Sequence, residues 1–258
     1  MSRPRSGAFT DAETLETDGC LLGQPQIYPP NCVYANKKGT FTVALVGDSH
    51  AAHWFPAVLA IAKDRGWKLV PYIKLSCRFL DMQLYSHWFQ RTYTECDTWR
   101  KTVVTKLQAL KPDLVIEASI RDLVTSDATD KDPVHQGEAM ARLLAKVPGA
   151  KAIIADTPIS RYNVPTCLSS HRSDERPCET DRTFALGASP GVVEQTAANV
   201  LGATLIDMTG IICPKSDGST CPVVIDGMIV YRDNQHMTAT FAASMRETLE
   251  ASLPPKSA

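Results

Sequence analysis

The stretch that decides the fold class is FTVALVGDSHAAHWFPAVLAIAKDRG, residues 41–66. Its first part, FTVALV, is a continuous apolar and β-branched run that ends at Gly47, as expected of a strand covered on both faces. From Trp54 to Arg65, apolar residues recur at helical spacing before a stop at Gly66. The stretch therefore predicts a strand, a tight turn and a helix.

The same alternation continues along the chain. The sequence predicts strands at residues 41–46, 68–74, 113–118, 150–155 and 203–208. It predicts helices at residues 54–65, 97–110, 134–147, 192–201 and 238–253. Strands that alternate with helices indicate an α/β fold, here a doubly wound, flavodoxin-like sheet of five parallel strands between two layers of helices.

Length and composition fit one domain of this kind. The chain has 258 residues, 44% of them hydrophobic, which is enough to bury a sizeable core. Its 27 basic and 28 acidic residues nearly cancel, so charge favours neither nucleic acid nor an anionic membrane surface as a partner. We expect residues 39–258 to form the domain. Residues 1–38, rich in Pro, Gly, Thr and acidic residues, should form a linker outside the sheet.

Eight cysteines are many for a cytosolic chain. Their order suggests four local pairs, Cys20 with Cys32, Cys77 with Cys96, Cys167 with Cys178, and Cys213 with Cys221. The first pair would pin part of the linker. An oxidising compartment is the simplest explanation. Free buried thiols are the alternative, and a zinc site is disfavoured because no C-x-x-C occurs.

The chain shows neither a run of about 18 apolar residues that would span a bilayer nor a signal peptide. Oxidised cysteines without an export signal lead us to expect a domain excised from a larger protein. Two long irregular stretches stand out, residues 157–190 and 210–233. The second contains a predicted hairpin that turns at Asp226-Gly227.

Two short motifs carry candidate chemistry. Ser49, in GDSH, follows the first predicted strand at its carboxyl end, where open parallel sheets bind ligands. A serine needs a base to become a nucleophile, and Asp233-Asn234-Gln235-His236 places a carboxylate three residues before an imidazole. We predict Ser49 as nucleophile, His236 as general base and Asp233 as the residue that orients His236. Each motif alone is also typical of a helix cap or a surface pair.

ALVGDSH followed by a distant D-x-x-H resembles the SGNH (GDSL-like) hydrolases. The wider context, C…PPNC…ALVGDSHAAHWFP and later YRDNQHMT, is similar to the extracytoplasmic SGNH domains fused to bacterial membrane-bound acyltransferases. The resemblance extends from about Cys20 to Met245. It implies an O-acetyltransferase of cell-envelope glycans, in which a membrane-bound acyltransferase domain of the same chain passes an acyl group outward and this domain places it on a glycan acceptor.

The chain departs from the family pattern in its oxyanion hole. SGNH enzymes usually carry a Gly after the second strand and an Asn in G-x-N-D after the third. Here Leu75-Ser76-Cys77 and Ser119-Ile120-Arg121-Asp122 stand at these places. The N–H of Ser49 keeps its role, the N–H of Ser76 is a candidate second donor, and Ser119 or Arg121 is a candidate replacement for the Asn. A missing donor can cost about 2.7–4 kcal/mol of transition-state stabilisation.

The sequence thus favours a serine-dependent O-acyltransferase of short acyl groups, with no cofactor, no metal and no nucleic-acid partner. A carbohydrate acetylesterase and a non-catalytic glycan-binding module are the alternatives. His50 and His53, with Asp48 nearby, imitate a metal site but suit better a polar helix start near the cleft. Trp54 and Phe55 are expected in the core or the pocket wall, with stacking on a glycan as the alternative. His87, Trp88 and Phe89 either line a sugar groove or form a stapled structural loop.

Overall fold

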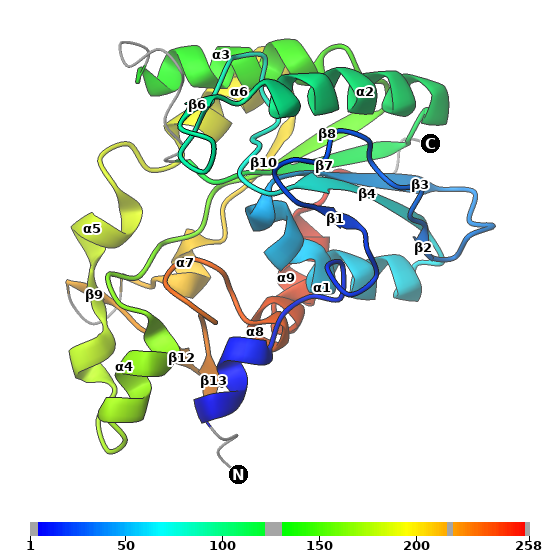
Figure 1. Ribbon diagram of the computed structural model, residues 1–258. Helices are drawn as coiled ribbons and strands as arrows, with labels where there is room; N and C mark the ends of the chain where they lie inside the picture. The colour runs from blue at the N-terminus through cyan, green and yellow to red at the C-terminus, as the bar shows by residue number, and fades with distance from the viewer. Residues whose placement is uncertain (1–4, 122–130, 216–218, 256–258) are drawn as a thin grey trace.

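The computed structural model describes residues 5–121, 131–215 and 219–255. A twisted central sheet lies between two layers of helices (Figure 1). The strands run in the order β1-β4-β3-β7-β8-β10, all parallel, and β2 pairs antiparallel with β4. The bounds are β1 (Leu21–Leu22), β2 (Tyr34–Ala35), β3 (Thr42–Gly47), β4 (Lys68–Lys74), β7 (Leu114–Ala118), β8 (Ala150–Ile154) and β10 (Thr204–Ile206).

The five predicted strands are present as β3, β4, β7, β8 and β10, and the fold class is confirmed. The predicted number of five strands is too small, because the described sheet has seven, with β1 and β2 added at its edge. Strand β3 lies between β4 and β7, so the chain order reverses there, and open parallel sheets generally bind ligands at the carboxyl ends of the strands at such a point. Both faces of β3 are covered, because its interior residues Val43–Val46 are completely buried. This burial explains why its sequence is a continuous apolar run rather than an alternating one.

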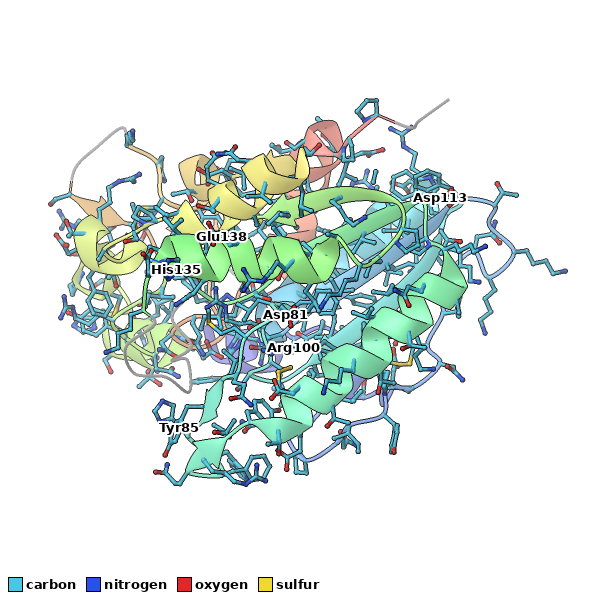
Figure 2. All side chains as sticks on the ribbon, turned by 90° about the horizontal axis from the view of Figure 1, so that it is seen from above. Asp81, Tyr85, Arg100, Asp113, His135 and Glu138 are labelled. Carbon is cyan, nitrogen blue, oxygen red and sulfur yellow. A yellow bond between two sulfur atoms is a disulfide. The ribbon has the colours of Figure 1, made fainter. Side chains whose placement is uncertain are left out.

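Each face of the sheet has its own hydrophobic core. Helices α1, α8 and α9 cover one face, and α2, α3 and α6 cover the other (Figure 1). Figure 2 shows α2 and α3 beside each other on the second face. The bounds are α1 (Ser49–Asp64), α2 (Thr94–Leu110), α3 (Pro133–Leu144), α6 (Val192–Leu201), α8 (Ala239–Ser244) and α9 (Arg246–Ser252).

Four of the five predicted helices differ from the structure in their bounds. Helix α2 begins at Thr94 rather than at residue 97, and α3 is Pro133–Leu144 rather than 134–147. Helix α1 begins at Ser49, one turn before the predicted start at Trp54. The predicted terminal helix 238–253 is divided at Met245 into α8 and α9. At this point the N–H of Met245 bonds to the carbonyl of Ala242, three residues back, and this tighter turn ends α8.

The expectation that residues 1–38 lie outside the sheet is wrong. Strands β1 and β2 both pair with the outer edge of β4, β1 at its carboxyl half and β2 at its amino half. Leu15, Cys20 and Leu22 are buried with the domain core. Two-residue strands are too short to show a period in the sequence, which is why the pattern missed them.

The two long irregular stretches hold short elements. The predicted hairpin is present as β12 and β13, with both turn residues, Asp226 and Gly227, at positive φ. The remaining elements are η1 (Arg5–Thr10), β5 (Tyr85–Ser86), β6 (Arg91–Thr92), α4 (Val164–Ser170), η2 (Arg176–Cys178), β9 (Thr180–Asp181), α5 (Arg182–Leu186), α7 (Thr209–Ile212), β11 (Thr220–Cys221), β12 (Val224–Ile225) and β13 (Met228–Ile229).

All eight cysteines are paired, and the pairs are the four local disulfides that the sequence predicts. They join Cys20 to Cys32, Cys77 to Cys96, Cys167 to Cys178, and Cys213 to Cys221. Their partners are 8 to 19 positions apart in the sequence, so each disulfide closes a local segment. In the part of the chain that the structure describes, no helix has the length and apolar character needed to cross a membrane.

Candidate active site

Ser49 stands at the sharp turn between β3 and α1, at the carboxyl edge of the sheet. Gly47 makes this turn possible, since it adopts a φ of +142° and a Cβ there would lie 1.8 Å from the carbonyl oxygen of Ala118. Asp48 caps the helix by accepting a hydrogen bond from the N–H of His50 at 2.9 Å. Ser49 is therefore the first residue of α1, where backbone N–H groups and the helix dipole favour an anion.

The turn 233–236 brings an imidazole to Ser49. One carboxylate oxygen of Asp233 accepts from the backbone N–H groups of Gln235 and His236, both at 2.8 Å. The other oxygen lies 2.7 Å from His236 Nδ1, and His236 Nε2 lies 2.9 Å from Ser49 Oγ. The structure thus brings together three residues separated by up to 187 positions in the chain.

The protonation states follow from the surroundings of Asp233. Burial alone would raise the pKa of this carboxyl group, but the hydrogen bond and charge of His236 and two backbone N–H groups lower it to about 2. An ionised Asp233 only accepts hydrogen bonds, so His236 Nδ1 carries the proton. In its neutral form, the ring with this tautomer presents the lone pair of Nε2 to the Ser49 hydroxyl.

A neighbouring segment, residues 158–164, holds this turn in place. The N–H of Ser160 donates to the carbonyl of Asn234 at 2.7 Å, and the N–H of Val164 donates to the carbonyl of Asp233 at 3.1 Å. The buried hydroxyl of Tyr231 donates to the carbonyl of Pro158 at 2.7 Å. The long stretch that contains Cys167 and Cys178 therefore fixes the backbone that carries His236.

Sequence reasoning missed a second buried pair, His50 with Asp156. Asp156 follows β8, and its carboxylate lies 2.5 Å from His50 Nδ1. It also accepts from the N–H of Thr157 at 2.8 Å and from the N–H of Arg121 at 3.0 Å. Burial lowers the pKa of His50, but the charge and hydrogen bond of Asp156 outweigh burial and raise it. The position of Asp156 at a strand's carboxyl end was the available signal.

His53, one turn along α1, behaves differently. It is 1% exposed, and among the described residues neither of its ring nitrogens has a hydrogen-bond partner. Burial, with the nearby charges of His50 and His236, lowers its pKa well below the ordinary value. Its ring lies 4.7 Å from that of His50, between centroids. Trp54 and Phe55 are buried in the core, as one of the two expectations had them.

The four oxyanion candidates have different surroundings. Ser76 follows β4 with a φ of +56°, a left-handed conformation that explains why the family uses Gly at this place. The Ser119 hydroxyl instead donates to the Glu117 carboxyl group at 2.5 Å. The Arg121 guanidinium is engaged by Asp156 and by the carbonyls of Thr157 and Leu186. The candidate replacements for the family Asn are thus bound within the protein, which leaves the N–H groups of Ser49 and Ser76.

The other predicted contact residues lie on the β5–β6 hairpin. His87 and Trp88 are exposed, Trp88 at 74%. Phe89 is half-buried beneath the Arg91 guanidinium, 4.7 Å from its ring centroid.

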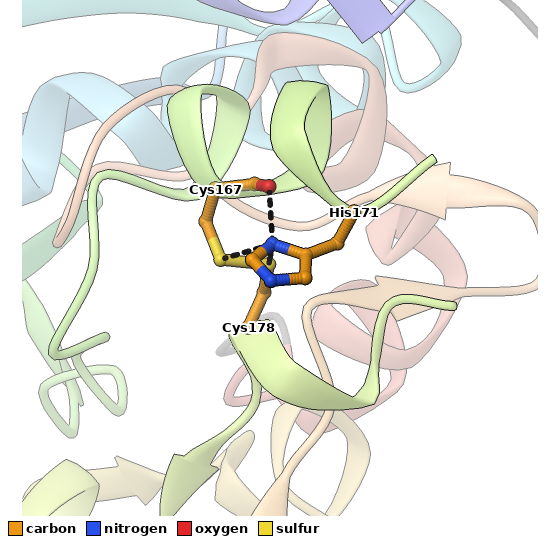
Figure 3. A group of neighbouring side chains, drawn as sticks. All are labelled: Cys167, His171 and Cys178. Carbon is orange, nitrogen blue, oxygen red and sulfur yellow. Dashed lines mark hydrogen bonds between the residues drawn. A yellow bond between two sulfur atoms is a disulfide. The ribbon is translucent and has the colours of Figure 1, made fainter. Parts of the chain in front are cut away.

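Cys167, His171 and Cys178 form a group with the spacing of three metal ligands (Figure 3). The two sulfur atoms are bonded to each other, however, and so are not thiolates. His171 Nδ1 lies 3.0 Å from the carbonyl oxygen of Cys167, and 3.6 and 3.7 Å from the two sulfurs. The group is best described as a disulfide covered by a histidine ring.

Comparisons with known proteins concern the fold and the family of the chain. The chain is similar in structure to the periplasmic domain of a lipopolysaccharide acetyltransferase of Salmonella ser. Paratyphi A, with a TM-score of 0.63. The match covers 97% of this chain and 89% of that chain, at 15% sequence identity, and shows the shared fold. A search of curated proteins finds no match. A family model described as SGNH domain (fused to AT3 domains) matches residues 16–251, and the chain belongs to this family.

Proposed function

We propose that this domain is a serine-dependent O-acyltransferase that places a short acyl group, such as acetyl, on a cell-envelope glycan. One observation carries the proposal, the contact of His236 Nε2 with Ser49 Oγ at 2.9 Å, with Asp233 on the far side of the ring at 2.7 Å. This is the arrangement that serine acyl-transfer enzymes use. Membership of a family fused to AT3 domains supports an acyl donor delivered by a membrane-bound acyltransferase domain of the same protein.

The first half-reaction loads the serine. His236 Nε2 takes the Ser49 hydroxyl proton as Oγ attacks the acyl carbonyl, and the carbonyl oxygen becomes an oxyanion. The N–H groups of Ser49 and Ser76 are the candidate donors to this oxyanion. When the tetrahedral species collapses, the bond to the leaving group breaks and His236 returns the proton to it, which leaves the acyl group on Ser49.

In the second half-reaction, a sugar hydroxyl takes the acyl group from Ser49. His236 removes its proton as the oxygen attacks the acyl-enzyme, and then returns a proton to Ser49 Oγ. Four disulfides support an extracytoplasmic location for this step. The cell-envelope acceptor is inferred from that location, together with what the printed name of the Salmonella domain says of that protein.

The triad is tested with an activated acyl ester and mass spectrometry of the intact protein. We expect one acyl mass on Ser49 and a loss of turnover of at least roughly a thousandfold in Ser49→Ala and His236→Ala. In Asp233→Asn, the amide donates to Nδ1 and forces the proton onto Nε2, so turnover should also fall. Ser169→Ala, which changes an exposed serine of α4, is the control. Undiminished turnover by Ser49→Ala would overturn the mechanism.

The acceptor decides between transferase and esterase. An acceptor held in line with the acyl carbonyl can contribute as much as ~7–11 kcal/mol to the rate. We therefore expect slow release of the acyl group to water, faster loss from Ser49 when an envelope oligosaccharide is added, and an O-acylated sugar as product. Rapid hydrolysis that no glycan accelerates would favour the acetylesterase. Absence of any acyl mass on Ser49 would favour a glycan-binding module.

A further inference from the structure

The peptide that carries the Ser76 N–H is held by residues outside its own loop. The hydroxyl of Tyr93, at the start of α2, donates to the Leu75 carbonyl at 3.0 Å. This carbonyl belongs to the same planar peptide group as the Ser76 N–H, so fixing one end fixes the direction of the other. Among the described residues, the Ser76 N–H has no hydrogen-bond acceptor of its own. The Ser76 N–H is therefore held in one direction, and no acceptor within the described residues uses it.

The same loop is attached to residues 23–26, which follow β1. The N–H of Leu75 donates to the carbonyl of Leu22 at 2.9 Å, which extends the β1–β4 pairing up to the residue before Ser76. The Tyr93 hydroxyl also contacts the carbonyl of Gln24 at 3.2 Å. One hydroxyl thus joins residues 23–26 to the Leu75–Ser76 peptide.

The side chain of Gln24 makes a further link. Its Nε2 donates a weak hydrogen bond to Ser76 Oγ at 3.4 Å, and its Oε1 accepts from Ser86 Oγ at 3.1 Å. The contact matters because Ser76 is a non-glycine residue at a φ of +56°, a conformation that the surroundings must support. Gln24 is one of the residues that support this conformation, and its side chain also links the Ser76 loop to the β5–β6 hairpin.

The buried side chain of Lys74 binds the backbone of residues 23–26. Its ammonium group donates to the carbonyls of Gly23 at 2.8 Å, Gln24 at 2.7 Å and Gln26. Three carbonyls match the three donors of an ammonium group, so the segment is bound at successive points along its backbone. Because Lys74 precedes Ser76 by only two residues, it attaches residues 23–26 to the end of β4 that leads into the Ser76 loop.

We propose that residues 23–26, through Gln24 and the shared Tyr93 hydroxyl, position the Ser76 N–H for the oxyanion. Gln24, Lys74 and Tyr93 are positioning residues in this scheme and do not touch the substrate. The inference rests on the proposed function, because it assigns work to Ser76 only if an oxyanion forms at Ser49. It makes the segment before the first long strand a part of the active site.

The test compares Gln24→Ala and Tyr93→Phe with the wild-type protein on an activated ester. A misdirected oxyanion donor weakens transition-state binding and leaves the substrate complex unchanged, so we expect kcat to fall about tenfold with KM within about twofold. Gln24→Glu keeps the acceptor for the Ser86 hydroxyl and can accept from the Ser76 hydroxyl in place of the lost N–H donor, so it should recover most of the rate. Affinity for a boronic acid that forms a tetrahedral adduct on Ser49 should fall with kcat.

Tyr85→Phe, at a residue labelled in Figure 2, is the matched control. Tyr85 lies on the same disulfide-closed segment as Tyr93, and its hydroxyl forms a hydrogen bond only with Gln90 among the described residues. Thermal unfolding identifies any variant that fails to fold. If Tyr93→Phe fails to fold, the test rests on the Gln24 variants alone, because Gln24 is partly exposed and its substitution should be tolerated by the fold. Wild-type kcat in Gln24→Ala, beside an inactive Ser49→Ala, would overturn the positioning role and leave the triad standing. An active Ser49→Ala would instead overturn the proposed function.

Discussion

Asp48 and Asp156 are fully buried carboxyl groups that tie together the turns around Ser49. Asp48 accepts from the N–H groups of His50 and Ile120, and so joins the turn after β3 to the turn after β7. Asp156 joins His50 to the turns after β7 and β8. A buried carboxylate costs several kcal/mol unless such donors surround it. The two aspartates therefore stabilise one particular arrangement of the three turns.

Asp233 makes a pH-dependent contribution to stability that can be measured. Its pKa of about 2 in the folded protein lies below the ordinary value of 3.8. Ionised Asp233 therefore favours the folded state above about pH 4, and this contribution is lost as the pH falls from about 4 through 2. Urea unfolding should show wild-type protein more stable than Asp233→Asn at pH 7, with a smaller difference at pH 3. A difference that does not change with pH would contradict this assignment.

Long periodic elements were predictable from the sequence, and short ones were not. Strand β4 was predicted with its observed bounds, Lys68–Lys74, and α6 with its bounds Val192–Leu201, because each repeats its pattern over several residues. Strands β1 and β2 are two residues long and exist because the edge of β4 pairs with them. Their formation depends on tertiary contacts that no local pattern contains.

The candidate site divides in the same way. Ser49 and the pair Asp233–His236 could be predicted because each lies in a short motif, GDSH or D-x-x-H, that suggests its own chemistry. Asp156 stands at a strand end but in no such motif, so nothing in the sequence pointed to His50 as its partner 106 positions away. Which group a polar side chain bonds is also decided by packing, as Arg121 shows by donating to Asp156.

The β3–α1 turn depends on one glycine. In Gly47→Ala the new Cβ would meet the Ala118 carbonyl oxygen at 1.8 Å and the Ala51 Cβ at 3.0 Å, at a φ that alanine rarely adopts. We expect a loss of at least about 2 kcal/mol in the free energy of unfolding, because neighbouring backbone must move. Gly210→Ala in α7, where a Cβ meets nothing within 4 Å, is the control and should be neutral or slightly stabilising. Wild-type stability of Gly47→Ala in urea would contradict this account.

The lead-in, residues 5–38, contacts the edge of the sheet, both hydrophobic cores and the start of α8. It covers the outer edge of β4 with β1 and β2, which removes an open strand edge that would otherwise pair with other chains. It places Leu15 in one hydrophobic core and Leu22 in the other. Asp11 accepts hydrogen bonds from the first residues of α8. A segment with the composition of a linker is thus integrated into the domain.

A chain that begins at Gly39 should therefore fold poorly. It would lose β1, β2 and the Cys20–Cys32 disulfide. It would also lose the buried side chains of Leu15 and Leu22, and burial of each leucine contributes about 1.5–3 kcal/mol. These losses compare with a total stability of about 5–15 kcal/mol for a typical domain. We expect aggregation or a melting temperature lowered by more than about 10 °C, measured by circular dichroism and light scattering. A chain that begins at Arg5, and so keeps all of these contacts, is the control, and a Gly39 chain that melts with it would show that the lead-in is a dispensable linker after all.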